Sequence, residues 1–335
     1  MPHISKSQIK LVRSLQLKKN RDELSLFVAE GNKCIEELSK VFTPYLYIML
    51  ATDPADTKRA HGNLVTGLDN CTDAKPTALG CTDTGTAATA PAATVTATAA
   101  EIRQMSSLKT PQGAIAVFHK QPATKGDMLA TAPGCTDAGT AATAAITLVL
   151  DGIQDPGNLG TIIRTAVWFG VTEIVCSPDT ADCFGPKVVQ ATMGALAQVH
   201  IAYRDLPSWL ATIRDSPIYG TLLDGKNIYE ILGCTDMLAT APADTKRAPG
   251  NLVTGLDNCT NMLATAPTAA VIIMGSEGNG ISKAVRPFIT HPIYIPTYAA
   301  EGHGIESLNV AIATGITLSV FCRKLSVLHR TITGQ

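Results

Sequence analysis

The chain of 335 residues has 27 lysines and arginines against 28 aspartates and glutamates, which gives a formal net charge of −1. This balance excludes a global positive field that would draw nucleic acid, so any such attraction must come from local basic patches. An apolar run of roughly 18 residues, which a transmembrane helix needs, does not occur, and the first residues lack the apolar core of a signal peptide. We therefore expect a cytoplasmic protein, and the length suggests two domains.

The first 21 residues form a basic stretch with six lysines and arginines, no acidic residue and interleaved apolar side chains. The pattern predicts a basic amphipathic helix that can hold a phosphate backbone, and a solvated lysine-rich surface is an equally good interpretation. The candidate phosphate contacts are Lys10, Arg13, Lys18 and Lys19.

Short apolar runs then predict a small α/β region that ends near residue 120. A strand is expected over Leu26–Ala29, a helix passes through residues 34–38, and a further apolar run covers residues 42–50. After a long interruption, a helix, a turn at Pro111–Gly113 and a strand over residues 114–118 complete the region.

Three stretches rich in alanine and threonine interrupt the chain, at residues 51–100, 121–145 and 233–269. They repeat one another, since Gly62–Thr72 recurs unchanged as Gly250–Thr260. The spacing of the copies is irregular, unlike the fixed period of a solenoid. We interpret these stretches as inserted low-complexity sequence that projects as loops or is disordered and has no role in catalysis.

The nine cysteines include no Cys-x-x-Cys pair, so we expect neither a zinc site nor a redox pair. The four that lie outside the repeats are expected to be buried free thiols, and they are Cys34, Cys176, Cys183 and Cys322.

Residues 146–176 predict a strand, a loop, a helix and a second strand. Apolar residues recur at helical spacing after the loop, and Gly170 is a plausible stop. Such a βαβ unit implies a parallel sheet, and ligands bind at the carboxyl ends of its strands, here beside Asp155–Asn158. We expect Asn158 to cap the helix, and Arg164 lies about 200° around the helix from Ile162, off the apolar face.

Further strands are expected over residues 198–202, 218–222 and 270–274, with a helix over 206–213. The last of these strands leads into a glycine-rich turn, Gly275–Gly280. A later strand ends at Ile295 and stops at Pro296, and residues 307–309 open an apolar helix.

The pattern Asn158-x-Gly160-x-x-x-Arg164-x-Ala166 resembles the first signature of the SpoU (TrmH-type) RNA 2′-O-ribose methyltransferases of the SPOUT superfamily. Ile272–Ile281 resembles the second signature, and Ile295-Pro296 followed by Glu306–Val310 resembles the third. The three stretches occur in the family's order, and each follows an apolar run. The span from Pro296 to Ser307 is longer than in the usual signature.

The resemblance implies an α/β fold with two domains. Residues 146–335 would form a trefoil-knot methyltransferase domain with a parallel sheet, interrupted by the insertion at 233–269. Residues 1–120 would form a small α/β, ribosomal-protein-like domain that binds the RNA substrate, interrupted at 51–100, and residues 121–145 would be a low-complexity linker. Family members are homodimers, so a homodimer is expected.

The resemblance also implies S-adenosylmethionine as the cofactor and assigns site residues. Arg164 would act on the ribose 2′-hydroxyl, either as base or as electrostatic stabiliser of the forming alkoxide. The implied catalytic residues are Arg164, Asn158, Glu277, Ser307 and Asn309, with Glu277 either ordering its loop or pairing with Arg164. The implied cofactor-binding residues are Gly275, Gly278, Ile295, Pro296 and Leu308. Lys187 is the residue that the resemblance turns toward the RNA, and an exposed lysine on an ordinary helix is an equally good interpretation. The other RNA-binding candidates, Lys10, Arg13, Lys18 and Lys19, come from the basic N-terminal pattern.

The expected reaction is methyl transfer to a ribose 2′-hydroxyl of ribosomal or transfer RNA. The alternative is an RNA-binding protein of the same fold whose insertions have impaired catalysis. A dinucleotide-dependent oxidoreductase is disfavoured because no Gly-x-Gly-x-x-Gly follows the first strand of the βαβ unit. A serine hydrolase is disfavoured because Ser276 lacks the Gly-x-Ser-x-Gly context.

Overall fold

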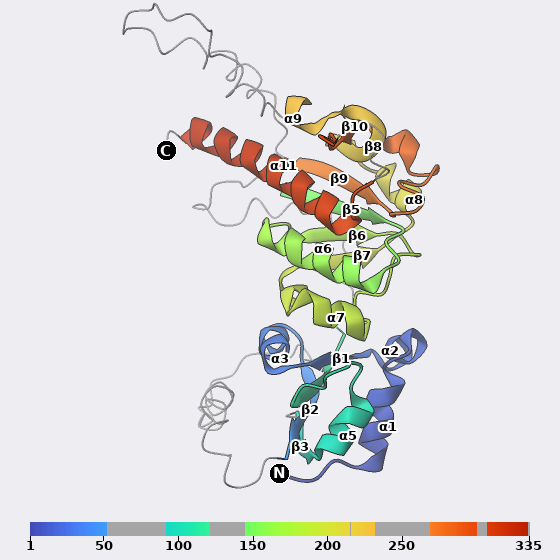
Figure 1. Cartoon of the computed structure of the whole chain (residues 1–335), viewed down its shortest axis with the longest axis vertical. Coiled ribbons are helices and arrows are strands. Elements are labelled where there is room, and N and C mark those ends of the chain that lie inside the picture. The colour runs from blue at the N-terminus through green and yellow to red at the C-terminus, as the bar shows by residue number, and fades with distance from the viewer. Residues whose placement is uncertain (52–91, 121–144, 215, 232–268, 300–306, 334–335) are drawn as a thin grey trace, which may run out of the picture. The chain divides into compact units, whose positions relative to one another are not determined.

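The computed structural model describes residues 1–51, 92–120, 145–214, 216–231, 269–299 and 307–333 (Figure 1). The chain divides into two compact units. Unit 1 comprises residues 1–122 and 184–197, and unit 2 comprises residues 123–183 and 198–335. Most of the repetitive sequence lies outside the described residues, so its expected loop character stays a prediction.

Unit 1 is built on a four-stranded sheet with the order β1-β4-β2-β3. The strands are β1 (Leu26–Glu30), β2 (Pro44–Leu50), β3 (Ala93–Ala97) and β4 (Ala114–His119). The helices are α1 (Lys6–Ser14), α2 (Lys18–Leu24), α3 (Asn32–Ser39), α5 (Ala99–Met105) and α7 (Pro186–Thr192). β4 runs antiparallel to both of its neighbours, whereas β2 and β3 are parallel.

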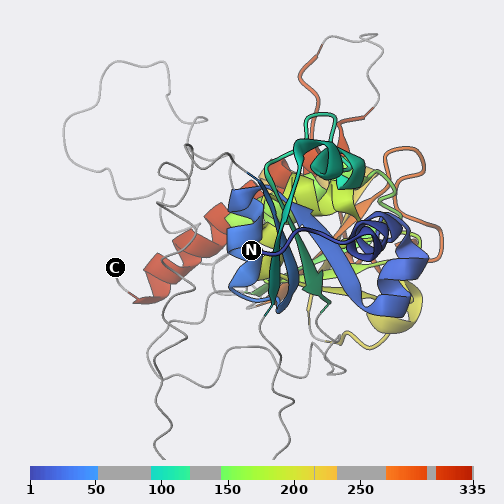
Figure 2. The ribbon, with the colours of Figure 1, turned by 90° about the horizontal axis from the view of Figure 1, so that it is seen from below.

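The alternation of side chains along these strands buries both faces of the sheet. Leu46 and Ile48 of β2 lie in a core with Val12 of α1 and Ile102 of α5. α3 lies on the other face, as the view in Figure 2 shows. There Phe27 of β1 stacks on aromatic rings that include Phe118, with 5.6 Å between ring centroids.

The basic N-terminal stretch forms two short helices instead of the single helix that the sequence predicted. Arg21 is buried, and its guanidinium donates hydrogen bonds to the carbonyls of Leu15 (2.8 Å) and Gln16 (2.9 Å), just beyond α1. These carbonyls lack helical partners, so the guanidinium fixes the break between the helices. The four basic residues named as phosphate contacts are exposed.

Residues 93–97 correct the expectation that the whole of 51–100 forms loops. They form β3, which pairs with β2 from Leu46↔Ala93 to Leu50↔Ala97. Val95 is 3% exposed and Ala97 is fully buried, so this part of the alanine- and threonine-rich stretch belongs to the core.

Unit 2 contains a six-stranded sheet with the order β10-β8-β9-β5-β6-β7, and every neighbouring pair is parallel. The strands are β5 (Ala145–Asp151), β6 (Glu173–Cys176), β7 (His200–Tyr203), β8 (Ile218–Asn227), β9 (Ala269–Gly275) and β10 (His291–Tyr294). The parallel sheet expected from the βαβ unit is therefore confirmed.

Helices cover both faces of this sheet. The helices are α6 (Pro156–Trp168), α8 (Leu206–Leu210), α9 (Ile228–Ile231) and α11 (Val310–Thr333). α6 packs against α11, and the two lie side by side in Figure 1. On the opposite face, Leu206 and Leu210 of α8 share a core with Val149 of β5 and Ile273 of β9.

The start of α6 differs in one detail from the prediction. Asp155, not Asn158, is the N-cap, because its Oδ1 accepts a hydrogen bond from the Asn158 N–H at 2.7 Å. Pro156 suits the first helical position. This places Asn158 in the first turn with its side chain available for other contacts. Gly170, with φ of 75°, follows the helix end, as predicted.

Burial favours the protonated thiol of Cys34 and of Cys176. Cys34, Cys176 and Cys183 are buried, and Cys322 is half-buried. Burial raises the pKa of Cys34 to about 11, and it raises the pKa of Cys176 as well. These thiols are therefore poor nucleophiles at neutral pH.

Of the helices in the described ranges, none is long and apolar enough to cross a membrane. The trefoil knot stays a prediction, since residues 300–306, which join β10 to α11, lie outside the described residues.

The turn after β9 is closed by backbone contact. Ser276 and Gly280 exchange two hydrogen bonds, of 3.1 and 2.8 Å, and Gly280 has φ of 64°. A Cβ on Gly275 would collide with the backbone of Gly280 and Ile281, whereas one on Gly278 would meet open space. Only glycine therefore fits at position 275 without opening the turn.

Gly275→Ala and Gly278→Ala form a matched pair of variants. Because the contact at Gly275 is with backbone, we expect Gly275→Ala to lower the free energy of unfolding by about 2 kcal/mol, a fall of several degrees in Tm. Gly278→Ala should change it by less than about 0.5 kcal/mol. Calorimetric melting of both variants tests this, and equal melting temperatures would show that the turn tolerates a side chain at 275.

Candidate active site

The first and second signature stretches meet at the carboxyl edge of the unit 2 sheet. β5 and β9 are neighbours, and their last residues, Asp151 and Gly275, are paired. The loops that follow these strands therefore leave the sheet together. This is the edge at which open α/β sheets bind ligands.

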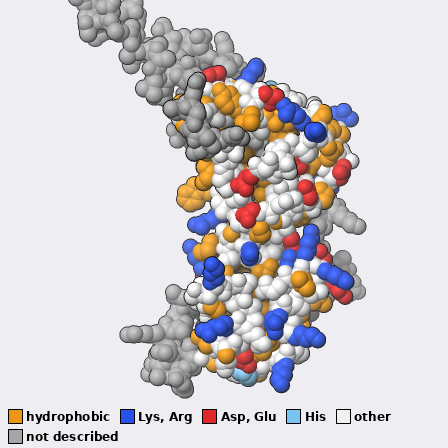
Figure 3. Space-filling view, turned by 45° about the vertical axis from the view of Figure 1, so that its right-hand side comes forward, with side chains coloured by type: hydrophobic (Ala, Val, Ile, Leu, Met, Phe, Trp, Pro, Cys, Tyr) orange, Lys and Arg blue, Asp and Glu red, His pale blue; other side chains and the backbone are white. Residues whose placement is uncertain are grey.

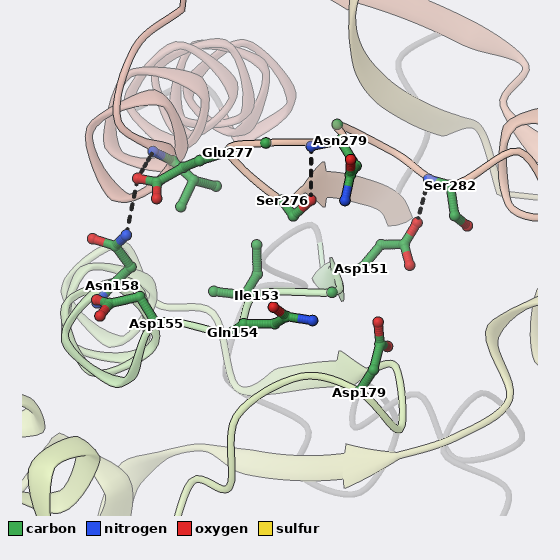
Figure 4. Close-up of a pocket in the computed structure, with 14 residues that line it drawn as sticks. Asp151, Ile153, Gln154, Asp155, Asn158, Asp179, Ser276, Glu277, Asn279 and Ser282 are labelled. Atoms are coloured by element: carbon green, nitrogen blue, oxygen red, sulfur yellow. Dashed lines mark hydrogen bonds between the residues drawn. The ribbon is translucent and has the colours of Figure 1, made fainter.

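The carboxylate of Glu277 joins all three signature stretches. Its Oε1 accepts hydrogen bonds from the side-chain amides of Asn158 (2.9 Å) and Asn309 (2.6 Å) and from the Val310 N–H (3.3 Å). The Asn309 amide also donates to Asn158 Oδ1 at 3.0 Å. Figure 4 shows Glu277 reaching from the loop after β9 toward Asn158 in α6. We call Glu277, Asn158 and Asn309 the Glu277 hub.

Asn309 also begins the last helix. Its Oδ1 accepts hydrogen bonds from the N–H groups of Ala311 (3.0 Å) and Ile312 (3.3 Å), so it acts as the N-cap of α11. The helix thus starts after Asn309 and not at Ser307, as the sequence suggested. The negative charge of Glu277 at this helix start is favourable because the N-terminus of a helix is electropositive.

Arg164 does not pair with Glu277. It lies exposed on α6, and its guanidinium has no hydrogen bond or ion pair within the described part of the chain. Of the two roles considered for Glu277, the structure therefore supports ordering of the loops. The guanidinium is available to meet a phosphate or a ribose.

A pocket of about 380 Å³ opens beside the Glu277 hub (Figure 4). The loops after β5, β6 and β9 line it, together with the first residue of α11. The lining residues are Asp151, Gly152, Ile153, Gln154, Asp155, Asn158, Asp179, Ser276, Glu277, Gly278, Asn279, Gly280, Ser282 and Val310.

The pocket brings together only some of the residues that the sequence singled out. Asn158, Glu277 and Gly278 line it, whereas Arg164, Ser307 and Leu308 do not. The contribution of the loop after β6, which brings Asp179 to the lining of the pocket, was not predicted from the sequence. One signal could have found it: in a βαβ unit the two strands end at the same edge.

The floor of the pocket is fixed by hydrogen bonds from buried groups. Asp151 is 7% exposed, and its Oδ2 accepts a hydrogen bond from the Ser282 N–H at 2.7 Å. The Ser177 hydroxyl accepts one from the Gly152 N–H at 2.8 Å and pairs with the Thr180 hydroxyl at 2.9 Å. These bonds tie the three loops to one another, so the pocket is largely preformed.

The remaining cofactor candidates lie at other places in unit 2. Ile295 and Pro296 follow directly on β10 and are half-buried. Leu308 precedes the Asn309 cap and is 47% exposed, and Ser307 is exposed beside it. These residues offer apolar surface and a hydroxyl group.

The basic residues named for RNA contact all belong to unit 1. Lys187 is exposed on α7. In sequence this helix lies between β6 and β7 of unit 2, but it belongs to unit 1. The ring of Phe184, just before α7, lies 4.9 Å from that of Phe27 in β1. Lysine and arginine side chains are spread over the face of this unit drawn in Figure 3.

Two family models match the chain. The model of the SpoU rRNA methylase family matches residues 145–319, and that of the MRM3-like substrate binding domain matches residues 6–116. The 23S rRNA (guanosine(2553)-2′-O)-methyltransferase RlmP of Bacillus subtilis is 29% identical over 177 residues, 52% of this chain and 57% of RlmP. The human mitochondrial rRNA methyltransferase 1 is 30% identical over 176 residues, 52% of this chain and 44% of the relative. The chain thus spans about half the length of these curated relatives.

Solved structures share this fold. A putative RNA methyltransferase of the TrmH family from Porphyromonas gingivalis is 31% identical, with a TM-score of 0.62 over 96% of this chain and 99% of that one. An rRNA methyltransferase from Sinorhizobium meliloti with bound AdoMet is 22% identical, with a TM-score of 0.62 over 96% and 97%. The family model covers more than half of the chain, and on this ground the chain belongs to the SpoU rRNA methylase family.

Proposed function

We propose that this protein transfers a methyl group from S-adenosylmethionine to a ribose 2′-hydroxyl of ribosomal RNA. The Glu277 hub is the observation that carries the proposal, because one carboxylate fixes the catalytic candidates Asn158 and Asn309. The names of the relatives support ribosomal RNA as the substrate. A cytoplasmic location is part of the proposal.

The residues assigned to the cofactor fit a nucleoside with a charged sulfonium. Leu308, Ile295 and Pro296 offer apolar surface for an adenine ring, and the open space at Gly278 admits a ligand against the backbone. The cofactor supplies an already activated methyl group, so the protein must position the reactants and raise the reactivity of the hydroxyl.

Arg164 is assigned to that second task. An arginine side chain stays protonated at neutral pH, so it stabilises the negative charge that develops on the ribose oxygen more readily than it removes a proton. Asn158, held by Glu277, orients Arg164 or the ribose. Ser307 and Asn309 bind polar groups at the start of α11.

Unit 1 is assigned to RNA binding. Lys10, Arg13, Lys18 and Lys19 are exposed on α1 and α2 or beside them, and Lys187 is exposed on α7. Basic side chains bind the phosphate backbone without reading sequence. The match to an MRM3-like substrate binding domain over residues 6–116 supports this assignment.

A homodimer is also part of the proposal. Trp168 at the end of α6 is 84% exposed, and Ile312 in α11 is 56% exposed. α6 packs on α11, so both large apolar side chains belong to one helix pair. Tryptophan is enriched at the centres of protein interfaces, where a second copy of the chain would bury it.

The cofactor assignment is tested by calorimetric titration with S-adenosylmethionine. We expect micromolar binding by the full chain and a loss of about tenfold or more in Leu308→Glu, because the new charge would have to be buried against the adenine. Leu223→Glu is the control, since Leu223 is 88% exposed on β8. A folded wild-type protein that binds no cofactor would favour the impaired RNA-binding protein.

The role of Arg164 is tested with the Arg164→Ala variant. Methyl transfer from labelled S-adenosylmethionine to ribosomal RNA should fall on the order of a hundredfold or more, as when other enzymes lose one stabilising donor. Cofactor affinity should stay unchanged, because Arg164 is assigned to the ribose. Retained methylation would remove Arg164 from the mechanism.

The dimer is tested by light scattering during size-exclusion chromatography. The wild-type chain should elute with the mass of two copies, and Trp168→Glu should weaken association by more than about tenfold. Leu223→Glu again serves as a control, because it adds the same charge at an exposed leucine outside α6 and α11. A monomeric wild-type protein would contradict this part of the proposal.

A further inference from the structure

The pocket beside the Glu277 hub is acidic. Its lining includes four carboxylates, from Asp151, Asp155, Asp179 and Glu277, and no lysine, arginine or histidine. Ionised carboxylates only accept hydrogen bonds. The pocket therefore disfavours phosphate and suits a ligand that presents N–H donors.

Three of the four carboxylates already serve the fold. Asp155 caps α6, Glu277 holds the hub, and Asp151 receives the Ser282 N–H. Asp151 is nonetheless of interest, because its other oxygen, Oδ1, has no hydrogen bond within the described residues although the side chain is more than nine-tenths buried. One acceptor is thus left over at the floor of the pocket.

Asp179 is the carboxylate with no structural task. It has no hydrogen bond or ion pair in the part of the chain that the structure describes. The turn that presents it is firmly held, since the Thr180 hydroxyl donates to the Leu150 carbonyl at 3.2 Å. A Cβ on Gly152 would lie 3.2 Å from Asp179 Oδ2, so the glycine leaves room for this carboxylate at the pocket.

We propose that Asp179 reads the base of the target nucleotide and selects guanine. The Watson–Crick edge of guanine places two donors side by side, N1–H and the 2-amino group, and one carboxylate can accept both. Adenine and cytosine each set an acceptor beside a single amino donor, and uracil sets its one donor between two acceptors. Only guanine therefore offers a paired contact without repulsion.

The rest of the pocket fits an unstacked base. Gln154 is exposed and has no other hydrogen bond in the described residues, so its amide N–H is available to the guanine O6. In Figure 4, Gln154 and Asp179 come from the loops after β5 and β6 and point into the space between them. Ile153 and Val310 add apolar wall, and proteins that read RNA sequence commonly splay bases out in this way.

The pocket is shared with the proposed reaction site. Asn158 and Glu277 line it along with Asp179, so a base held there has its ribose beside the Glu277 hub. This inference rests on the proposed function for its biological meaning, but base binding itself can be measured without methyl transfer.

The test is calorimetric titration of the full chain with three nucleotides, GMP, IMP and AMP, in the millimolar range. IMP keeps N1–H but lacks the 2-amino group. We expect GMP to bind at least tenfold more tightly than AMP, with IMP between them. Asp179→Asn should lower GMP affinity at least tenfold and abolish the preference, because its amide turns a donor toward the donors of guanine.

Asp182→Asn is the matched control, since Asp182 follows in the same loop but does not line the pocket. It should keep the preference for GMP. Equal affinity for the three nucleotides, binding of none of them, or an unchanged preference in Asp179→Asn would overturn the proposal.

A second readout separates this proposal from the proposed function. Ribosomal RNA methylated by the enzyme is digested to nucleosides and analysed by mass spectrometry. Formation of 2′-O-methylguanosine supports both proposals, and formation of another methylated nucleoside overturns the guanine assignment while the methyltransferase stands. GMP preference without cofactor binding or methyl transfer would leave base reading in place and overturn the methyltransferase.

Discussion

The architecture of the candidate site depends on one carboxylate. Glu277 sits on the turn after β9 and binds the first turn of α6 and the first residues of α11 through a single oxygen. Hydrogen bonds to an ionised acceptor are stronger than neutral ones, which matters for an exposed group that competes with water. Asn158 and Asn309, at the two helix starts, are 151 residues apart in sequence. Each helix has a local cap, but Glu277 links the two starts to each other.

The parallel sheet supplies the second constraint. Because β5 lies between β6 and β9, three consecutive strands release their loops at one edge. Buried Asp151, Ser177 and Thr180 then bond these loops to one another. These hydrogen bonds make the three loops rigid although they have no regular secondary structure. Asp179, which has no hydrogen bond of its own among the described residues, therefore keeps a defined position at the pocket.

Much of the secondary structure of unit 2 could be predicted, because the patterns of apolar residues that mark its strands and helices are local in sequence. The apolar period over residues 146–176 gave strand, helix, strand and the parallel sheet, all confirmed. The predicted N-cap residue of α6 was wrong, because aspartate and asparagine are both good N-caps and only the fold selects Asp155 over Asn158. β3 was not predicted, because alanine and threonine differ too little in polarity to show the alternation of buried and exposed residues that marks a strand. Asp179 was not predicted, although it follows the second strand of the βαβ unit over residues 146–176, and that strand ends at the same edge of the sheet as the first.

The short passage of residues 184–197 from between β6 and β7 into unit 1 has a consequence for the modularity of the protein. The chain enters unit 1 twice, and the second entry brings Phe184 against Phe27 and α7 against β1. A fragment that ends at residue 116, where the substrate-domain match ends, would leave part of the aromatic cluster of Phe27 without its partner ring. An exchange of unit 1 between relatives would therefore have to move residues 184–197 together with the N-terminal segment.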